Sequence, residues 1–223
     1  MQMIRSFRSR FRYFFLKVQA MVLLAFGHPA GALARFDQMV SGWPLDRYGL
    51  ASRAHVLARL NRLEASIFSQ QQLVGLPGSQ AQLAVAWFNL GYLLQQAGRH
   101  DEARPAFEKA TEFNLCMDQA WYGLALVLIH QRKFHEARQA LKKNTALQPM
   151  SPYGWYRLAE VHLALGAPEK SRKVIDHLRS FEPRVAAQLE REISMAASFA
   201  LQADHTHKPA NFAATGGAPD VVH

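Results

Sequence analysis

The sequence has a single cysteine, Cys116, among its 223 residues. One thiol cannot form an internal disulfide or a thiolate metal cluster, so stability must come from a hydrophobic core. The apolar fraction of 49% and the chain length are sufficient for such a core. A glycine-rich phosphate loop, a His-Glu zinc motif and a nucleophile elbow are also missing. We therefore expect no enzyme activity, no metal site and no cofactor.

Acidic residues are missing from the first 36 positions, although the whole chain has a formal net charge of +9. The stretch from Asp101 to Glu192 mixes both signs. The basic character therefore belongs mainly to the N-terminus, which carries Arg5, Arg8, Arg10, Arg12, Lys17 and Arg35. A nucleic-acid-associated basic repeat protein is the alternative function that the high pI suggests, but nucleic acid is not the favoured partner.

The N-terminal segment, residues 1–36, has apolar residues at helical spacing between positions 3 and 26, with basic residues largely elsewhere. This pattern predicts a basic amphipathic helix, whereas Lys17, Gln19 and Pro29 interrupt any run long enough to span a bilayer. If the helix lies on an anionic membrane, the residues expected to contact it are Arg5, Phe7, Arg8, Phe11, Arg12, Phe14 and Val18.

Four interpretations of this segment remain open at this stage. It is an interfacial membrane anchor, a helix packed on the rest of the protein, an organelle presequence, or a signal peptide cleaved after Ala32–Ala34. The anchor would place a cytoplasmic protein at the inner face of a membrane. The signal peptide would give an exported protein.

An internal period of 34 residues is set by Trp87, Trp121 and Trp155. The same interval relates Leu90 to Leu124 and Leu158. Within each unit the tryptophan and leucine share one helix face, and a small residue beside them lets a second helix approach. The pattern predicts a helix–turn–helix unit in which Trp121 is buried between stacked helices. Further columns are Gly91, Ala125 and Ala159, and Ala103, Ala137 and Ser171.

The segments "AWFNLGYLLQQAGRHDEARPAFEKA", "AWYGLALVLIHQRKFHEARQALKKN" and "GWYRLAEVHLALGAPEKSRKVIDHL" resemble tetratricopeptide repeats. The resemblance implies an all-α fold, a right-handed superhelix of paired helices with a concave groove. We predict three repeats over residues 84–185, with N-terminal helices and a degenerate repeat at 46–77 within residues 37–83. A capping helix over 186–203 and a disordered tail over 204–223 complete the plan. Arg132 departs from the pattern, because Gly98 and Gly166 stand at the matching turn positions.

Members of this family usually bind ligands along the inner face of the first helix of each repeat. Only Asn89 and Arg157 match the clamp with which its chaperone-binding members hold a terminal carboxylate, so a chaperone adaptor is disfavoured. We expect instead a scaffold or adaptor that binds a peptide or helix of another protein, with self-association left open. The residues predicted to line the groove are Phe88, Tyr92, Gln95, Gln96, Gln119, Tyr122, Leu126, His130, Tyr153, Tyr156, Arg157 and Glu160.

Overall fold

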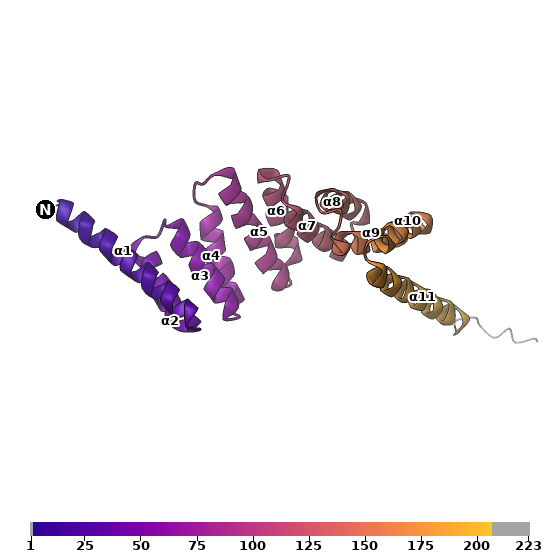
Figure 1. The fold of residues 1–223 in the computed structure, drawn as a ribbon, viewed down its shortest axis with the longest axis horizontal. Helices are drawn as coiled ribbons and strands as arrows, with labels where there is room; N and C mark the ends of the chain where they lie inside the picture. Colours follow the sequence, from indigo (N-terminus) through magenta and orange to yellow (C-terminus); the bar gives the residue numbers. More distant parts are fainter. Residues whose placement is uncertain (1, 207–223) are drawn as a thin grey trace, which may run out of the picture.

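The computed structural model describes the backbone of residues 2–206 and the side chains of residues 9–195. Within residues 2–206 every regular element is an α-helix, and successive helices pack side by side into an elongated stack (Figure 1). The predicted all-α superhelix of helical hairpins is confirmed. The eleven helices of this range are α1 (Gln2–Ala25), α2 (Pro29–Gly42), α3 (Arg47–Arg59), α4 (Leu63–Val74), α5 (Gln80–Gln96), α6 (His100–Phe113), α7 (Asp118–His130), α8 (Phe134–Leu147), α9 (Pro152–Ala164), α10 (Pro168–Arg179) and α11 (Pro183–Thr206).

Five hairpins, from α1–α2 to α9–α10, share one kind of turn. Each turn contains one residue with positive φ, the conformation that ends a helix tightly. These residues are 34 apart, except that 37 residues separate the second from the third. The turn residues are Gly27, Asn61, Gly98, Arg132 and Gly166.

Arg132 adopts φ 57°, so this turn has the same left-handed backbone as the turns at Gly98 and Gly166, although its residue is not glycine. A side chain with a Cβ is strained in this region, whereas glycine is not. We expect Arg132→Gly to raise the free energy of unfolding by about 0.5–1 kcal/mol, measured by urea denaturation. Lys133→Gly is the matched control, because Lys133 has φ −85° and should gain nothing. An equal gain from both variants would contradict the strain argument.

The boundary predicted at residue 36 falls inside α2 and is wrong. Phe36 is buried against Leu16 and Ala20 of α1, so residues on both sides of the boundary belong to one packed cluster. Ala32 and Leu33, within the stretch considered as a cleavage site, are also buried there. The sequence missed this hairpin because its residues lack the tryptophan and leucine columns of the later repeats.

The central core extends from α4 to α9, and its largest fully buried ring is Phe107. Trp121 is only partly buried, in contrast to the prediction from the 34-residue period. Its indole Nε1 donates to the carbonyl of Leu115 at 2.8 Å, and Trp155 donates to Pro149 in the same way. The indole N–H requires an acceptor, and the nearest free carbonyls lie in the turns between repeats. The tryptophans therefore lie at the edge of the core rather than at its centre.

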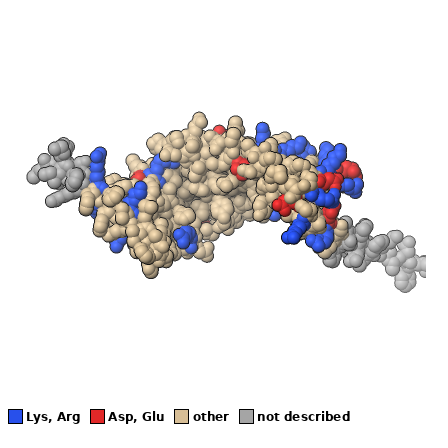
Figure 2. All heavy atoms as spheres, in the orientation of Figure 1, with Lys and Arg blue, Asp and Glu red and all other residues tan. Residues whose placement is uncertain are grey.

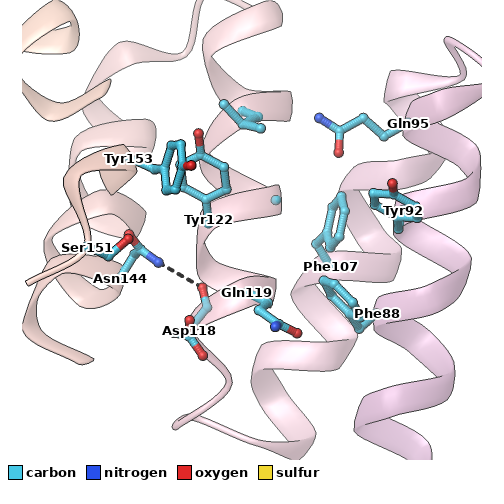
Figure 3. Close-up of a pocket in the computed structure, with 12 residues that line it drawn as sticks. Phe88, Tyr92, Gln95, Phe107, Asp118, Gln119, Tyr122, Asn144, Ser151 and Tyr153 are labelled. Carbon is cyan, nitrogen blue, oxygen red and sulfur yellow. Dashed lines mark hydrogen bonds between the residues drawn. The ribbon is translucent and has the colours of Figure 1, made fainter. Parts of the chain in front are cut away.

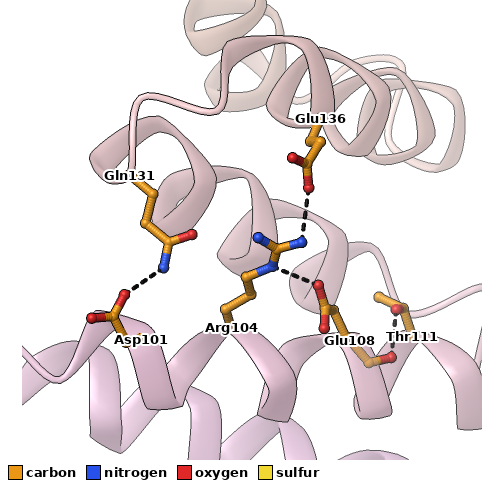
Figure 4. Close-up of polar contacts among 6 residues, drawn as sticks. All are labelled: Asp101, Arg104, Glu108, Thr111, Gln131 and Glu136. Atoms are coloured by element: carbon orange, nitrogen blue, oxygen red, sulfur yellow. Dashed lines mark hydrogen bonds and ion pairs between the residues drawn. The ribbon is translucent and has the colours of Figure 1, made fainter.

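Polar contacts link the α5–α6 hairpin to the α7–α8 hairpin on the side of the second helices (Figure 4). Arg104 of α6 bridges Glu108 on its own helix, at 2.7 Å, and Glu136 of α8, at 2.8 Å. Gln131, just after α7, donates to Asp101 of α6 at 2.9 Å. Each exposed pair contributes little alone, but together they fix the rotation of one hairpin on the next.

The C-terminal helix α11 packs on the last hairpin through Ala186 and Leu189, which are buried against α9 and α10. Glu190 pairs with Arg179 of α10, and Glu192 accepts a hydrogen bond from Tyr156 of α9. One face of α11 therefore covers the end of the stack, and polar residues lie on the other face, as the end of a repeat stack requires. Of the disordered tail predicted over residues 204–223, residues 204–206 belong to α11, and the remainder lies outside the described residues.

Candidate functional site

A pocket of about 320 Å³ opens between the first helices of successive hairpins, α5, α7 and α9 (Figure 3). Helices α6 and α8 form its floor. The family resemblance predicts that such first helices line the inner face of the superhelix, so the pocket lies where the concave groove is expected. The residues that line it are Phe88, Tyr92, Gln95, Phe107, Asp118, Gln119, Tyr122, Gly123, Leu126, Asn144, Ser151 and Tyr153.

Phe107 forms the base of the pocket because two glycines make room for its ring. A Cβ on Gly123 of α7 would lie 2.5 Å from the ring, and a Cβ on Gly91 of α5 would lie 2.9 Å from it. Both distances are shorter than a carbon–carbon contact allows. The ring is therefore wedged between α5 and α7, and the missing side chains leave the hollow above it.

Aromatic rings flank the pocket on two sides. Phe88 and Tyr92 of α5 stack at a centroid distance of 6.4 Å, and Phe88 also contacts Phe107 at 6.0 Å. Tyr122 of α7 and Tyr153 of α9 line the other side (Figure 3). Tyr153 is 70% exposed, so a flat apolar ring with a free edge is available to a ligand.

The amide group at the base of the pocket is used within the fold. The buried Asn144 of α8 donates from Nδ2 to the carbonyl of Asp118 at 3.0 Å. Gly154 allows this contact, because a Cβ there would lie 2.1 Å from Oδ1 of Asn144. None of the residues that line the pocket is Lys or Arg. The pocket therefore suits an apolar or aromatic group better than a phosphate or carboxylate.

The concave groove, as we name the row of four adjoining hollows, extends on both sides of this pocket. Tyr92 also lines a hollow between α3 and α5, and Asn89 connects that hollow to a further one beside Arg47. Toward α11, Tyr122 and Tyr153 also line a hollow that includes Tyr156 and Arg157. The groove therefore continues across four hairpins, with its most aromatic part in the middle.

At the α11 end of the groove, Tyr156 and Arg157 are held by acidic partners. Tyr156 donates its hydroxyl to Glu192, and this hydrogen bond, together with burial, raises the pKa of Tyr156 to about 12. The phenol therefore stays protonated at neutral pH. Arg157 pairs with Glu160 at 2.8 Å, so its charge is partly neutralised within the fold.

The structure brings most of the predicted groove residues together. Glu160 and Gln96 contribute indirectly, by bonding Arg157 and the hydroxyl of Tyr92. His130 does not line any part of the groove, because it ends α7 and its ring packs on His100 at 3.8 Å. Phe107, Gly123 and Asn144 were missed. Seven of the predicted residues line the central pocket, and two more, Tyr156 and Arg157, lie in the adjoining hollow. The seven are Phe88, Tyr92, Gln95, Gln119, Tyr122, Leu126 and Tyr153.

A family model for the tetratricopeptide repeat matches residues 88–143 and 122–181. These matches start in α5 and end just after α10. Residues 88–181 therefore consist of tetratricopeptide repeats. Proteins of this family are generally non-enzymatic interaction scaffolds that bind other proteins or peptides.

Solved structures with the same fold include three tetratricopeptide repeat proteins. A crystal structure of MamA superposes with a TM-score of 0.72 at 17% identity, covering 79% of this chain and 94% of MamA. MamA from Desulfovibrio magneticus RS-1 gives 0.67 at 16% identity, with 81% and 96% covered. YrrB, described as having an unusual peptide-binding site, gives 0.68 at 16% identity, with 77% and 88% covered. At these identities the likeness shows the fold alone.

The search of curated proteins found no match to this sequence. Among the described residues no group of three or more His, Cys, Asp or Glu side chains could hold a metal ion. In the same part of the chain, no helix is both long and apolar enough to cross a membrane.

Proposed function

We propose that this tetratricopeptide repeat protein is a non-enzymatic adaptor that binds a segment of another protein in the concave groove. The observation that carries the proposal is the central pocket, in which exposed aromatic rings surround a hollow that the protein's own side chains do not fill. Tyrosine buries a large surface at low entropic cost and keeps a hydroxyl for hydrogen bonding, which suits it to protein interfaces. The peptide-binding site reported for YrrB supports the same use of this fold.

The partner segment should present apolar or aromatic side chains at the centre and polar ones toward both ends. The pocket between α5, α7 and α9 is lined mainly by rings, aliphatic groups and amides, with Asp118 as its one charged residue, whereas Arg47, Arg157 and Glu160 lie nearer the ends of the groove. An amphipathic helix laid in the groove satisfies this distribution, with its apolar face on the rings. Nucleic acid does not, since stacked bases need Lys or Arg between the aromatic rings.

The proposal also places the protein at the inner face of a membrane, held from one side rather than inserted across the bilayer. Its support is the basic N-terminal helix α1, whose apolar residues are only partly used in packing. An adaptor fixed at a surface would hold its partner segment close to that surface.

The test begins with selection of random linear peptides displayed on phage against the folded chain. A selected peptide, labelled with fluorescein, then serves as the probe for fluorescence polarisation. We expect the selected peptides to be rich in aromatic and aliphatic residues. We expect Tyr122→Ala with Tyr153→Ala to weaken binding by about tenfold, because truncated interface rings commonly cost more than 1 kcal/mol.

The matched control is Phe68→Ala, which removes an exposed ring of α4 that lines no part of the groove. Circular dichroism should show wild-type helicity in both variants. Tyr156 is a poorer choice for truncation, because its hydroxyl holds Glu192 and the loss would also loosen α11. Equal weakening by the control, or unchanged affinity in the double variant, would show that the peptides bind elsewhere.

A further inference from the structure

The helix α1 has two apolar faces, and only one of them is used by the fold. One face packs on α2 through Leu16 and Ala20, which are at most 5% exposed. The opposite side, which we name the outer face, has exposures between 41% and 76% for its large apolar residues. It consists of Phe11, Phe14, Phe15, Val18, Met21, Val22 and the adjoining Phe26.

The borders of the outer face are basic on both sides. At 3.6 residues per turn, Arg10 and Lys17 lie along one border of this face and Arg12 lies along the other. Lys17 is held in place with its Nζ 4.0 Å from the ring of Tyr48. In Figure 2, most of the described charged residues near the α1 end of the molecule are Lys or Arg.

No acidic residue offsets this charge within residues 1–36, and the next two are already engaged. Asp37 pairs with Arg53 at 2.6 Å, and Asp46 accepts hydrogen bonds from Tyr13 and from the backbone of Gly49. The outer face is therefore apolar, with Arg10 and Lys17 along one border and Arg12 along the other. No acidic residue of this segment offsets their positive charge.

We propose that the outer face of α1 docks on an anionic lipid surface, with its apolar side chains at the level of the acyl chains and Arg10, Arg12 and Lys17 at the lipid phosphates. This rests on the proposed membrane location and adds that the docking face is the one that α1 does not use to pack on α2. An apolar face with basic borders is typical of helices that lie in the membrane interface. A second copy of the chain is a poorer occupant, because pairing two such faces would bring basic borders together.

Membrane docking through the outer face does not disturb the packing of α1 on α2. Because α1 binds α2 through its other face, the helix can enter the interface without leaving the protein. Docking therefore requires no unfolding of the hairpin, and lipid binding should leave peptide binding in the groove unchanged.

The experiment measures cosedimentation of the full chain with vesicles of phosphatidylcholine, with or without phosphatidylglycerol. We expect binding to the anionic vesicles to exceed binding to the neutral ones by at least about tenfold. Arg10→Gln with Arg12→Gln should reduce anionic binding by roughly tenfold or more, as basic residues near an anionic surface act together. The outer-face variant, Phe11→Gln with Phe14→Gln and Val18→Gln, should abolish it.

The matched control changes three equally exposed apolar residues on other helices and turns, Phe68→Gln with Leu115→Gln and Met150→Gln. It should bind lipid like the wild type, and circular dichroism should show all variants folded. Absence of binding to anionic vesicles, or an equal loss in the control, would overturn the proposal. The proposal would also be overturned if light scattering showed a dimer for the wild type and a monomer for the outer-face variant, and neither protein bound lipid. The peptide assay without vesicles tests the groove separately, so the two proposals can fail independently.

Discussion

Phe107→Ala is expected to lower the free energy of unfolding by about 3–5 kcal/mol, the usual cost of removing a fully buried phenylalanine. The side chain is 0% exposed and touches the helices on both sides of it, so no neighbour can move in without breaking another contact. For a domain of this size the loss corresponds to a fall in melting temperature of about 6–20 °C. Urea denaturation followed by circular dichroism measures the loss directly.

Two comparison variants make this result specific. Phe68→Ala removes a ring that is 57% exposed and should change stability by no more than about 0.5 kcal/mol. Trp121→Ala should cost less than Phe107→Ala, because the indole is only partly buried. If Trp121→Ala proved the more damaging of the two, the core would be centred on the tryptophan columns, and Phe107 would not be its main support.

Gly123→Ala should destabilise the chain by about 2 kcal/mol, although alanine is normally the better helix residue. The added methyl would lie 2.5 Å from Phe107, and the ring cannot withdraw toward α5, where Gly91 already lies against it. The methyl would also narrow the central pocket, so the same variant should bind the selected peptide more weakly. Urea denaturation and fluorescence polarisation measure the two effects.

Rescue by a smaller side chain distinguishes this clash from a general effect of the substitution. In the double variant Gly123→Ala with Phe107→Leu, the methyl has room, so the combined loss should be smaller than the sum of the single losses by about 1 kcal/mol. Simple additivity would mean that the methyl and the ring do not meet. Glycine at position 123 would then need another explanation.

The sequence predicted the repeat architecture well because its signals are local. Tryptophan, leucine and small residues at a fixed interval describe how two helices of one hairpin meet, and Gly98 and Gly166 mark the turns. The first hairpin was missed because α1 and α2 use different residues, such as Phe36 and Met39, to fill the equivalent space. Only the left-handed Gly27, 34 residues before Asn61, keeps the register of the later hairpins.

The groove was predicted less completely, since its base comes from the second helices. Register along the first helices identifies Phe88, Tyr122 and Tyr153, but it cannot show that Phe107 reaches across from α6. The signal for this ring was the pair of helix glycines, Gly91 and Gly123, of which the repeat pattern marks only Gly91 as a small position. His130 was predicted from its register alone. It is the last residue of α7, and its ring packs on His100 rather than lining the groove.

Within residues 2–206 each helix packs mainly on its neighbours along the chain, so the two ends of the stack lie far apart. Stability in such a molecule is a local property, and an end hairpin can open while the middle stays folded. Amide hydrogen exchange should therefore be slowest in α6 and α7 and faster toward both ends. A ligand in the central pocket contacts α5, α7 and α9 together, so its binding should lengthen the slowly exchanging region outward from the centre, one helix at a time.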